Sequence, residues 1–168
     1  ELPNRFVYQG AHQRLKVAAA MAAALARGAD AEAIRAGLDE FEGVADRGEL
    51  VAEIDGVLFV NDTSATAPAA AIAALDAFSG RQIHVIAGGF DKQLDLGPLG
   101  AALAARATTV LLLEGTATPR LMESITANGG SWSGPFDSMR AAVEAGSEIA
   151  ASGDVVLLSP GCASFGLF

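Results

Sequence analysis

After residue 50, short apolar runs alternate with segments that favour helices, and this alternation constrains the fold more than any other feature. The runs are nearly continuous in Val, Ile and Leu, so both faces of each strand are expected to be buried. Strands that alternate with helices in this way form βαβ units. The pattern therefore predicts an α/β, Rossmann-like, mostly parallel sheet with helices on both faces. Residues 50–60 are expected to form two strands around an Asp55–Gly56 hairpin turn. The expected strand–helix pairs are 57–60 with 68–78, 83–87 with 98–106 and 110–113 with 119–128, and a helix at 137–151 precedes the strand 155–158.

Two helices are expected before this pattern begins. Residues 15–27 form a strong helix-forming segment that Gly28 is placed to end, and Asp30 is placed to cap a second helix directly after it. A loop-like segment follows and marks a domain boundary. We therefore expect a helical part at residues 1–43 and the α/β domain at residues 44–168.

Composition and charge exclude several classes of function. A hydrophobic content of 51% is enough for a buried core, and a formal net charge of −9 argues against a protein that binds nucleic-acid phosphates. No apolar stretch reaches the roughly 20 residues that a membrane-spanning helix needs. The single cysteine, Cys162, excludes an internal disulfide and fits a reducing cytoplasm. We expect a cytoplasmic protein with neither a nucleic-acid nor a membrane partner.

Polar or glycine-rich sequence follows four of the expected strands, as NDTSAT, GGFDKQLD, EGTATPR and SPGCASF. Ligands of parallel sheets bind beyond the carboxyl ends of the strands, so these loops predict a site for a small anionic molecule. A purely structural interpretation stays open for the first loop, in which Thr63 or Thr66 caps the helix that begins at Pro68. Likewise, Lys92 in the second loop has the alternative of a solvated surface lysine.

The remaining reactive residue types do not form a catalytic set. Cys162 is expected to be a small buried residue, because neither His12, in a loop that leads into the first helix, nor His84, in a buried strand, is placed to activate it. No group of residues has the spacing of metal ligands. The residues alone thus predict a small-molecule site but no reaction.

Four longer phrases, YQGAHQRLKVAAA, FEGVADRGELVAEIDGVLFVNDTSATAP, VIAGGFDKQLDLGPL and VVLLSPGCASF, together resemble the Mur ligase family. They occur in the family's order from about Gly10 to Phe168, and the likeness is strongest to the glutamate-adding, MurD type. The resemblance implies an enzyme of three domains, in which residues 1–43 are the helical tail of the central ATPase domain and the rest is the C-terminal glutamate-binding domain.

The resemblance also implies a reaction. Such enzymes activate the carboxylate of UDP-N-acetylmuramoyl-L-alanine with ATP and Mg²⁺ as an acyl phosphate, which the amine of glutamate attacks. This is a cytoplasmic step of peptidoglycan synthesis, and we expect a monomer. The phosphate-binding loop and most Mg²⁺ ligands are expected in a region upstream of this chain. No catalytic residue is assigned within the chain, which is expected to be inactive alone.

Residue by residue, the resemblance places two substrates. The ATP-binding candidates are Gln13, Lys16, Arg47 and Asp62, where Gln13 and Lys16 stand at two positions that are Asn in the family. The glutamate-binding candidates are Ser64, Thr66, Lys92, Ser164 and Phe165. Ser64 replaces a lysine of the family pattern. That loss of a cation leaves the identity or stereochemistry of the amino acid open.

Two alternative functions are compatible with the same fold. One is another ligase of this superfamily, such as a relative of folylpolyglutamate synthase. The other is a nucleotide-binding, Rossmann-like module without catalysis, against which the missing G-x-G-x-x-G pattern weighs.

Overall fold

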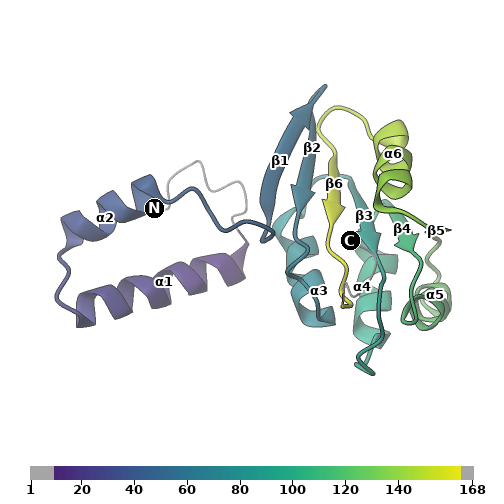
Figure 1. Cartoon of the computed structure of the whole chain (residues 1–168), viewed down its shortest axis with the longest axis horizontal. Helices are drawn as coiled ribbons and strands as arrows, with labels where there is room; N and C mark the ends of the chain where they lie inside the picture. Colours follow the sequence, from purple (N-terminus) through teal and green to yellow (C-terminus); the bar gives the residue numbers. More distant parts are fainter. Residues whose placement is uncertain (1–9, 164–168) are drawn as a thin grey trace.

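A computed structural model describes residues 10–163 (Figure 1). One six-stranded sheet has the order β1-β2-β6-β3-β4-β5, and only the β1–β2 pairing is antiparallel. The expected α/β, Rossmann-like fold is confirmed. The helices are α1 (Ala11–Ala26), α2 (Ala31–Glu40), α3 (Pro68–Ala77), α4 (Gly97–Arg106), α5 (Thr118–Ala127) and α6 (Met139–Ile149), and the strands are β1 (Glu49–Ile54), β2 (Val57–Asn61), β3 (Ile83–Ala87), β4 (Thr109–Leu113), β5 (Ser133–Phe136) and β6 (Val155–Leu158).

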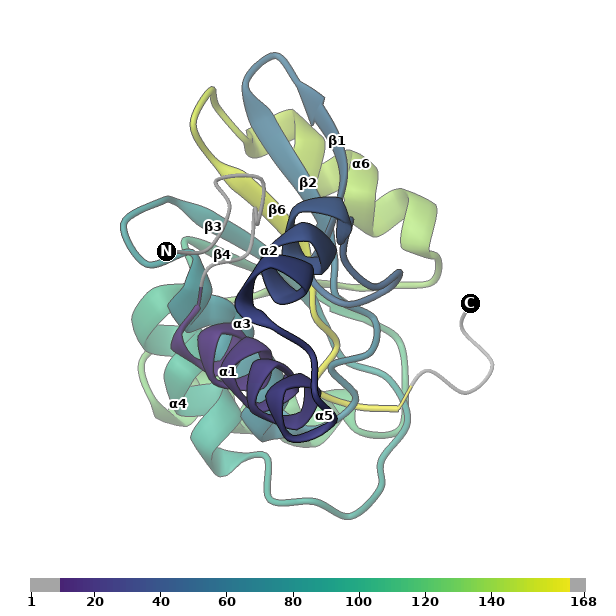
Figure 2. The ribbon, with the colours of Figure 1, turned by 90° about the vertical axis from the view of Figure 1, so that its left-hand side faces the viewer.

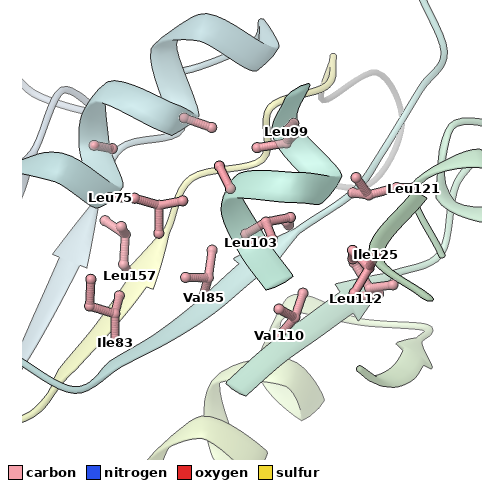
Figure 3. Packing of buried hydrophobic residues seen from close by; sticks show 14 of the residues in the cluster. Leu75, Ile83, Val85, Leu99, Leu103, Val110, Leu112, Leu121, Ile125 and Leu157 are labelled. Carbon is pink, nitrogen blue, oxygen red and sulfur yellow. The ribbon is translucent and has the colours of Figure 1, made fainter. Parts of the chain in front are cut away.

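Alternate residues of the central strands pack against different helices. On one face of the sheet, β-strand side chains meet apolar residues of α3, α4 and α5 (Figure 3). On the other face, Ile86, Leu111 and Val156 pack against α6. Helices therefore cover both faces, as predicted, and the continuous apolar runs are explained by burial on both sides. The labelled core residues of the first face are Leu75, Ile83, Val85, Leu99, Leu103, Val110, Leu112, Leu121, Ile125 and Leu157.

Helices α1 and α2 lie beside each other, away from the sheet (Figure 1), and face the viewer in Figure 2. Gly28 follows α1 with a φ of 93°, and the Asp30 carboxylate accepts a hydrogen bond from the Ala33 N–H at 2.8 Å, so both expected helix ends are confirmed. The prediction that His12 lies in a loop before the first helix is wrong, because α1 begins at Ala11 and includes the backbone of His12. Within residues 10–163, no helix is long and apolar enough to cross a membrane.

The two edge strands differ in how well the sequence predicts them. β1 is joined to β2 by Asp55 and Gly56, whose φ angles of 52° and 80° suit the two-residue hairpin that an Asp-Gly pair favours. β5 is not predicted, because Gly134 and Pro135 disfavour a strand. Its edge position explains the exception, since an edge strand pairs on one side only and tolerates the missing N–H of proline.

The parallel register brings the candidate loops together at the carboxyl ends of the strands. Leu158, at the end of β6, is the register partner of both Asn61 at the end of β2 and Ile86 in β3. Ala87 at the end of β3 pairs in turn with Leu112 in β4. The loops that follow β2, β3, β4 and β6 consequently leave the sheet at the same end, the carboxyl end of the parallel strands. Ligands of such sheets bind there.

Candidate functional site

Asp62, the first residue after β2, is buried and joins three parts of the chain. Its carboxylate accepts hydrogen bonds from the Gly48 N–H at 3.0 Å and from the Ser159 hydroxyl at 3.1 Å. Burial raises the pKa of Asp62, and these two hydrogen bonds and the charges of Arg47 and Lys16 oppose that rise. The carboxylate therefore fixes the segment before β1 to the ends of β2 and β6, close to the cations of Arg47 and Lys16.

A pocket of about 700 Å³ lies between the α1–α2 pair and the segment that leads into β1. Three of the four ATP-binding candidates, Gln13, Lys16 and Arg47, line it. Asp62 is not among the lining residues, but its hydrogen-bond partner Gly48 is. The other lining residues are Val17, Ala20, Gly37, Leu38, Phe41, Glu42, Gly43, Val44, Ala45, Glu49 and Leu50. The pocket thus combines apolar side chains with two cations, Lys16 on α1 and Arg47 before β1, and with the carboxylates of Glu42 and Glu49.

Asp46 holds the segment that carries Arg47 against the end of β2. Its backbone carbonyl accepts a hydrogen bond from the Ser64 N–H at 2.9 Å, and its carboxylate accepts one from the Asn61 side-chain amide at 2.9 Å. Asp46 itself has a φ of 61°, the left-handed region. Arg47 is therefore presented by a folded turn rather than by a loose linker.

Lys92 and Thr66, two of the glutamate-binding candidates, meet at the carboxyl edge of the sheet. The Lys92 Nζ lies 3.5 Å from the Thr66 Oγ1, at the long limit of a hydrogen bond. Lys92 is exposed, and Thr66 is half-buried. An ammonium group and a hydroxyl from two different post-strand loops are thus available to one ligand.

Helix capping by the NDTSAT loop does not occur, so that structural interpretation is wrong. The N-cap of α3 is Ala67, which has no side-chain cap, and Pro68 occupies the first turn. The hydroxyl of Thr63 instead donates to the side chain of Asn61. Ser64 is half-buried beside these residues. The hydroxyl of Thr66 is therefore not used by the helix and faces Lys92.

The loop after β6 is joined to the loop after β3. Phe90 and Ala163 form an antiparallel bridge, in which the Phe90 N–H donates to the Ala163 carbonyl at 2.7 Å. Ser164 and Phe165, the two remaining glutamate-binding candidates, follow this bridge and lie outside the described residues. The bridge places Ala163 beside the Lys92 loop.

Cys162 and His84 are buried residues without a catalytic arrangement. Cys162 is 4% exposed, as expected, and burial raises the pKa of its thiol to about 11, so it is protonated at neutral pH. His84 is buried in β3, also as expected, and its Nε2 lies 3.1 Å from the Asp154 carboxylate, at the amino end of the strand. Within the described part of the chain, no three His, Cys, Asp or Glu side chains are grouped to hold a metal ion.

Sequence reasoning missed several partners at this edge of the sheet. Gly48 and Ser159 hold Asp62, while Arg120 and Thr116 contact Asp91 beside Lys92. The polar phrases that follow strands contain three of these partners, Ser159, Thr116 and Arg120. Their place in those phrases indicates that they lie near the site. The sequence does not predict which residues they contact, because each contact joins segments that lie 25 residues or more apart in the chain.

Comparisons of the sequence with known proteins give one family and several named relatives. The family described as "Mur ligase, glutamate ligase domain" matches residues 46–162. The UDP-N-acetylmuramoylalanine–D-glutamate ligase of Roseiflexus sp. (strain RS-1) is 51% identical over 95% of this chain, and that of Symbiobacterium thermophilum is 41% identical over 93%. The chain spans about one third (34%) of the length of both relatives.

Solved structures show the same fold at lower sequence identity. The UDP-N-acetylmuramate–alanine ligase MurC of Thermotoga maritima matches 90% of this chain, and the chain covers 35% of it, with a TM-score of 0.70 and 20% identity. E. coli FolC in complex with ADP matches 87%, and the chain covers 36% of it, with a TM-score of 0.66 and 24% identity. The family match over residues 46–162, which is more than half of the chain, shows that this chain belongs to the Mur ligase family and carries its glutamate ligase domain.

Proposed function

We propose that this chain is the C-terminal part of an ATP-dependent ligase that joins D-glutamate to UDP-N-acetylmuramoyl-L-alanine. The observation that carries the proposal is the meeting of Lys92 and Thr66 at the carboxyl edge of the sheet, within the glutamate ligase domain. The names of the relatives support the choice of amino acid and acceptor. The whole reaction belongs to a longer protein, of which this chain corresponds to about one third (34%).

In this proposal, Lys92 binds a carboxylate of glutamate and Thr66 supplies a hydroxyl to the same ligand. An ammonium group makes a charge-assisted hydrogen bond to a carboxylate, which is stronger than a neutral one. Ser64 offers a hydroxyl where the family pattern has a lysine. Ser164 and Phe165 complete the proposed set of glutamate-binding residues.

The pocket beside α1 and α2 is the proposed ATP site. The Gln13 amide is suited to a base edge, and Lys16 and Arg47 are suited to phosphates, because guanidinium and ammonium groups donate to phosphate oxygens. Asp62 is proposed to lie near the ribose and phosphates. Its buried position next to Arg47 and Lys16 supports a place at the rim of this site.

We propose two domains, with residues 1–43 as the tail of the ATPase domain and residues 44–168 as the glutamate-binding domain. The position of α1 and α2 away from the sheet (Figure 1) supports this boundary. The described residues form no metal cluster, and we propose that Mg²⁺ is held mainly by the ATPase domain of the full protein. Bound with ATP, Mg²⁺ would stabilise the charge of the transferred phosphoryl group. The chain alone is then inactive, and the full enzyme is proposed to be a cytoplasmic monomer.

The test is an amino-acid screen with the full-length protein, ATP, Mg²⁺ and UDP-N-acetylmuramoyl-L-alanine, in which phosphate release is measured. D-glutamate is expected to support release, and L-glutamate and D-aspartate are expected to support far less. Release with L-glutamate alone would keep the ligase but reject the enantiomer. Activity only with a folate acceptor would favour the folylpolyglutamate synthase alternative, and binding of ATP without any release would favour a non-catalytic module.

A further inference from the structure

We propose that Arg120 is a positioning residue, which sets the place of Lys92 by clamping the carboxylate of Asp91. Arg120 lies on α5, which follows β4 in the chain, whereas the Lys92 loop follows β3. The proposal rests on the function proposed above for Lys92. It adds a residue from a fourth post-strand segment, the one after β4, to the glutamate site.

Lys92 is the middle residue of a turn that the side chain of Asp91 closes. The Oδ1 of Asp91 accepts a hydrogen bond from the Gln93 N–H at 2.6 Å, two residues along the chain. Gln93 has a φ of 59°, the left-handed region that few residues other than glycine adopt. A side-chain hydrogen bond thus holds a backbone conformation that the residue type does not favour, directly next to Lys92.

Arg120 grips this turn at two points. Its Nη1 donates to both carboxylate oxygens of Asp91, at 3.0 and 2.8 Å, and its Nη2 donates to the Leu94 carbonyl at 3.1 Å. The two points lie on either side of Lys92 in the chain. The hydrogen bond from Arg120 also lowers the pKa of Asp91. The carboxylate is therefore charged at neutral pH, where it accepts from the guanidinium.

The backbone before this turn is fixed independently of Arg120. The Ala117 N–H donates to the Gly89 carbonyl at 2.9 Å, and the Asp91 N–H donates to the Thr116 hydroxyl at 2.9 Å. Phe90 is bridged to Ala163 on the other side. The chain therefore arrives at Asp91 in a fixed position, and the Arg120 clamp continues that order over the four residues that include Lys92.

A second arginine–aspartate pair in the same domain provides a matched control. Arg106 and Asp76 join α4 to α3, and the Arg106 side chain is 43% exposed, close to the 46% of Arg120. Asp76 is 59% exposed against 20% for Asp91. The Arg106 pair lies on helices and touches neither post-strand loop, so its loss should leave the glutamate site unchanged.

The experiment uses the full-length ligase and measures kcat and KM for the amino-acid substrate, ATP and the UDP-linked substrate separately. Arg120→Met is expected to raise the KM for glutamate about tenfold, since a displaced binding group loses its contact, while the KM for ATP stays within twofold. Arg120→Lys should recover part of the loss, and Arg106→Met should behave as wild type. An unchanged KM for glutamate in Arg120→Met, or an equal rise for all three substrates, would overturn the proposal.

A double-mutant cycle separates positioning from direct contact. Lys92→Met is expected to lower kcat/KM for glutamate by about 10- to 100-fold, and Arg120→Met is expected to add less than a further twofold in the Lys92→Met background. Full additivity would show that Arg120 acts independently of Lys92 and would overturn the proposal. An unchanged kcat/KM in Lys92→Met would instead reject the proposed glutamate site itself.

Asp91→Asn keeps the test decisive if Arg120→Met fails to fold. The amide oxygen of Asn still accepts from the Gln93 N–H, but the charged partner of Arg120 is lost. The same selective rise in the KM for glutamate is expected. A folded Asp91→Asn enzyme with wild-type KM would count against the clamp.

Discussion

Asp62 illustrates how a single carboxylate at this site has both a structural and a proposed functional part. It is 5% exposed and is held by Gly48 and Ser159, so its removal leaves two donors without an acceptor. Burial raises its pKa, which means that the charged form is disfavoured in the folded state and that stability falls as the pH rises above 3.8 through the folded-state pKa. A neutral side chain of the same shape escapes that effect.

We therefore predict different outcomes for two substitutions of Asp62. Asp62→Ala should destabilise the domain by about 1–3 kcal/mol, because buried donors lose their partner. Asp62→Asn should stay within about 1 kcal/mol of wild type at pH 7, because its amide oxygen accepts from the Gly48 N–H, its amide NH2 donates to the Ser159 hydroxyl, and a buried charge is removed. Urea unfolding of the 168-residue chain measures both. If Asp62→Asn proves as destabilising as Asp62→Ala, the charge itself is required by the fold.

Thr66 tests whether the hydroxyls of the NDTSAT loop serve the helix or the ligand. Because the N-cap of α3 is Ala67, Thr66→Val should change the free energy of unfolding by less than about 0.5 kcal/mol, whereas loss of a true cap costs about 1 kcal/mol. In the full-length enzyme, the same change should raise the KM for glutamate several-fold. A large loss of stability with an unchanged KM would restore the capping interpretation. Thr126→Val, on α5, is a control for the KM alone, because the Thr126 hydroxyl accepts a hydrogen bond from the Trp132 indole N–H at 3.3 Å and its removal affects stability.

At the level of elements, β3 is anchored at its amino end by a polar pair, the buried His84 and the half-buried Asp154. His84 Nε2 and the Ala151 N–H both contact the Asp154 carboxylate, and no hydrogen-bond partner of the His84 Nδ1 is present among the described residues. The Ala151 N–H, and after it His84, lower the pKa of Asp154. This pair fixes the turn between α6 and β6 to the neighbouring strand.

The lowered pKa gives a pH dependence with a definite sign. A carboxylate whose folded-state pKa lies below its unfolded value contributes stability above that unfolded value, and the contribution is lost as the pH falls through the folded-state pKa. Asp154→Asn should therefore lower the melting temperature at pH 7, and the difference from wild type should shrink below pH 3.8. Thermal melts across this range measure it. A difference that is independent of pH would show that geometry, and not charge, is what Asp154 provides.

The elements that the sequence predicts well are those whose signal is local. β3, β4 and β6 follow from continuous apolar runs, and the Asp55–Gly56 hairpin follows from turn chemistry. β5 is missed because its Gly and Pro oppose a strand, and only its edge position permits it. The hydroxyl of Thr66 and the clamp of Arg120 are tertiary contacts between segments 26 and 29 residues apart, which no local pattern reports.

At the level of the whole molecule, the helical pair and the sheet domain are expected to be separable. No residue of α2 is buried, and the core clusters consist of residues from Val57 onward. We predict that residues 44–168 alone retain a cooperative thermal transition within about 5 °C of the 168-residue chain. They should lose the pocket proposed for ATP, because Gln13 and Lys16 line it. Failure of the shorter chain to fold would place the domain boundary elsewhere.

The order of the sheet has a consequence for biosynthesis. β6 comes last of the six strands in the chain, yet it lies between β2 and β3, which do not pair with each other. Until residues 155–158 leave the ribosome, the hairpin of β1 and β2 has no neighbour on its inner side, and neither does the unit formed by β3, β4 and β5. Closure of the sheet is therefore a late, long-range step, during which unpaired strand edges are open to aggregation or to chaperones.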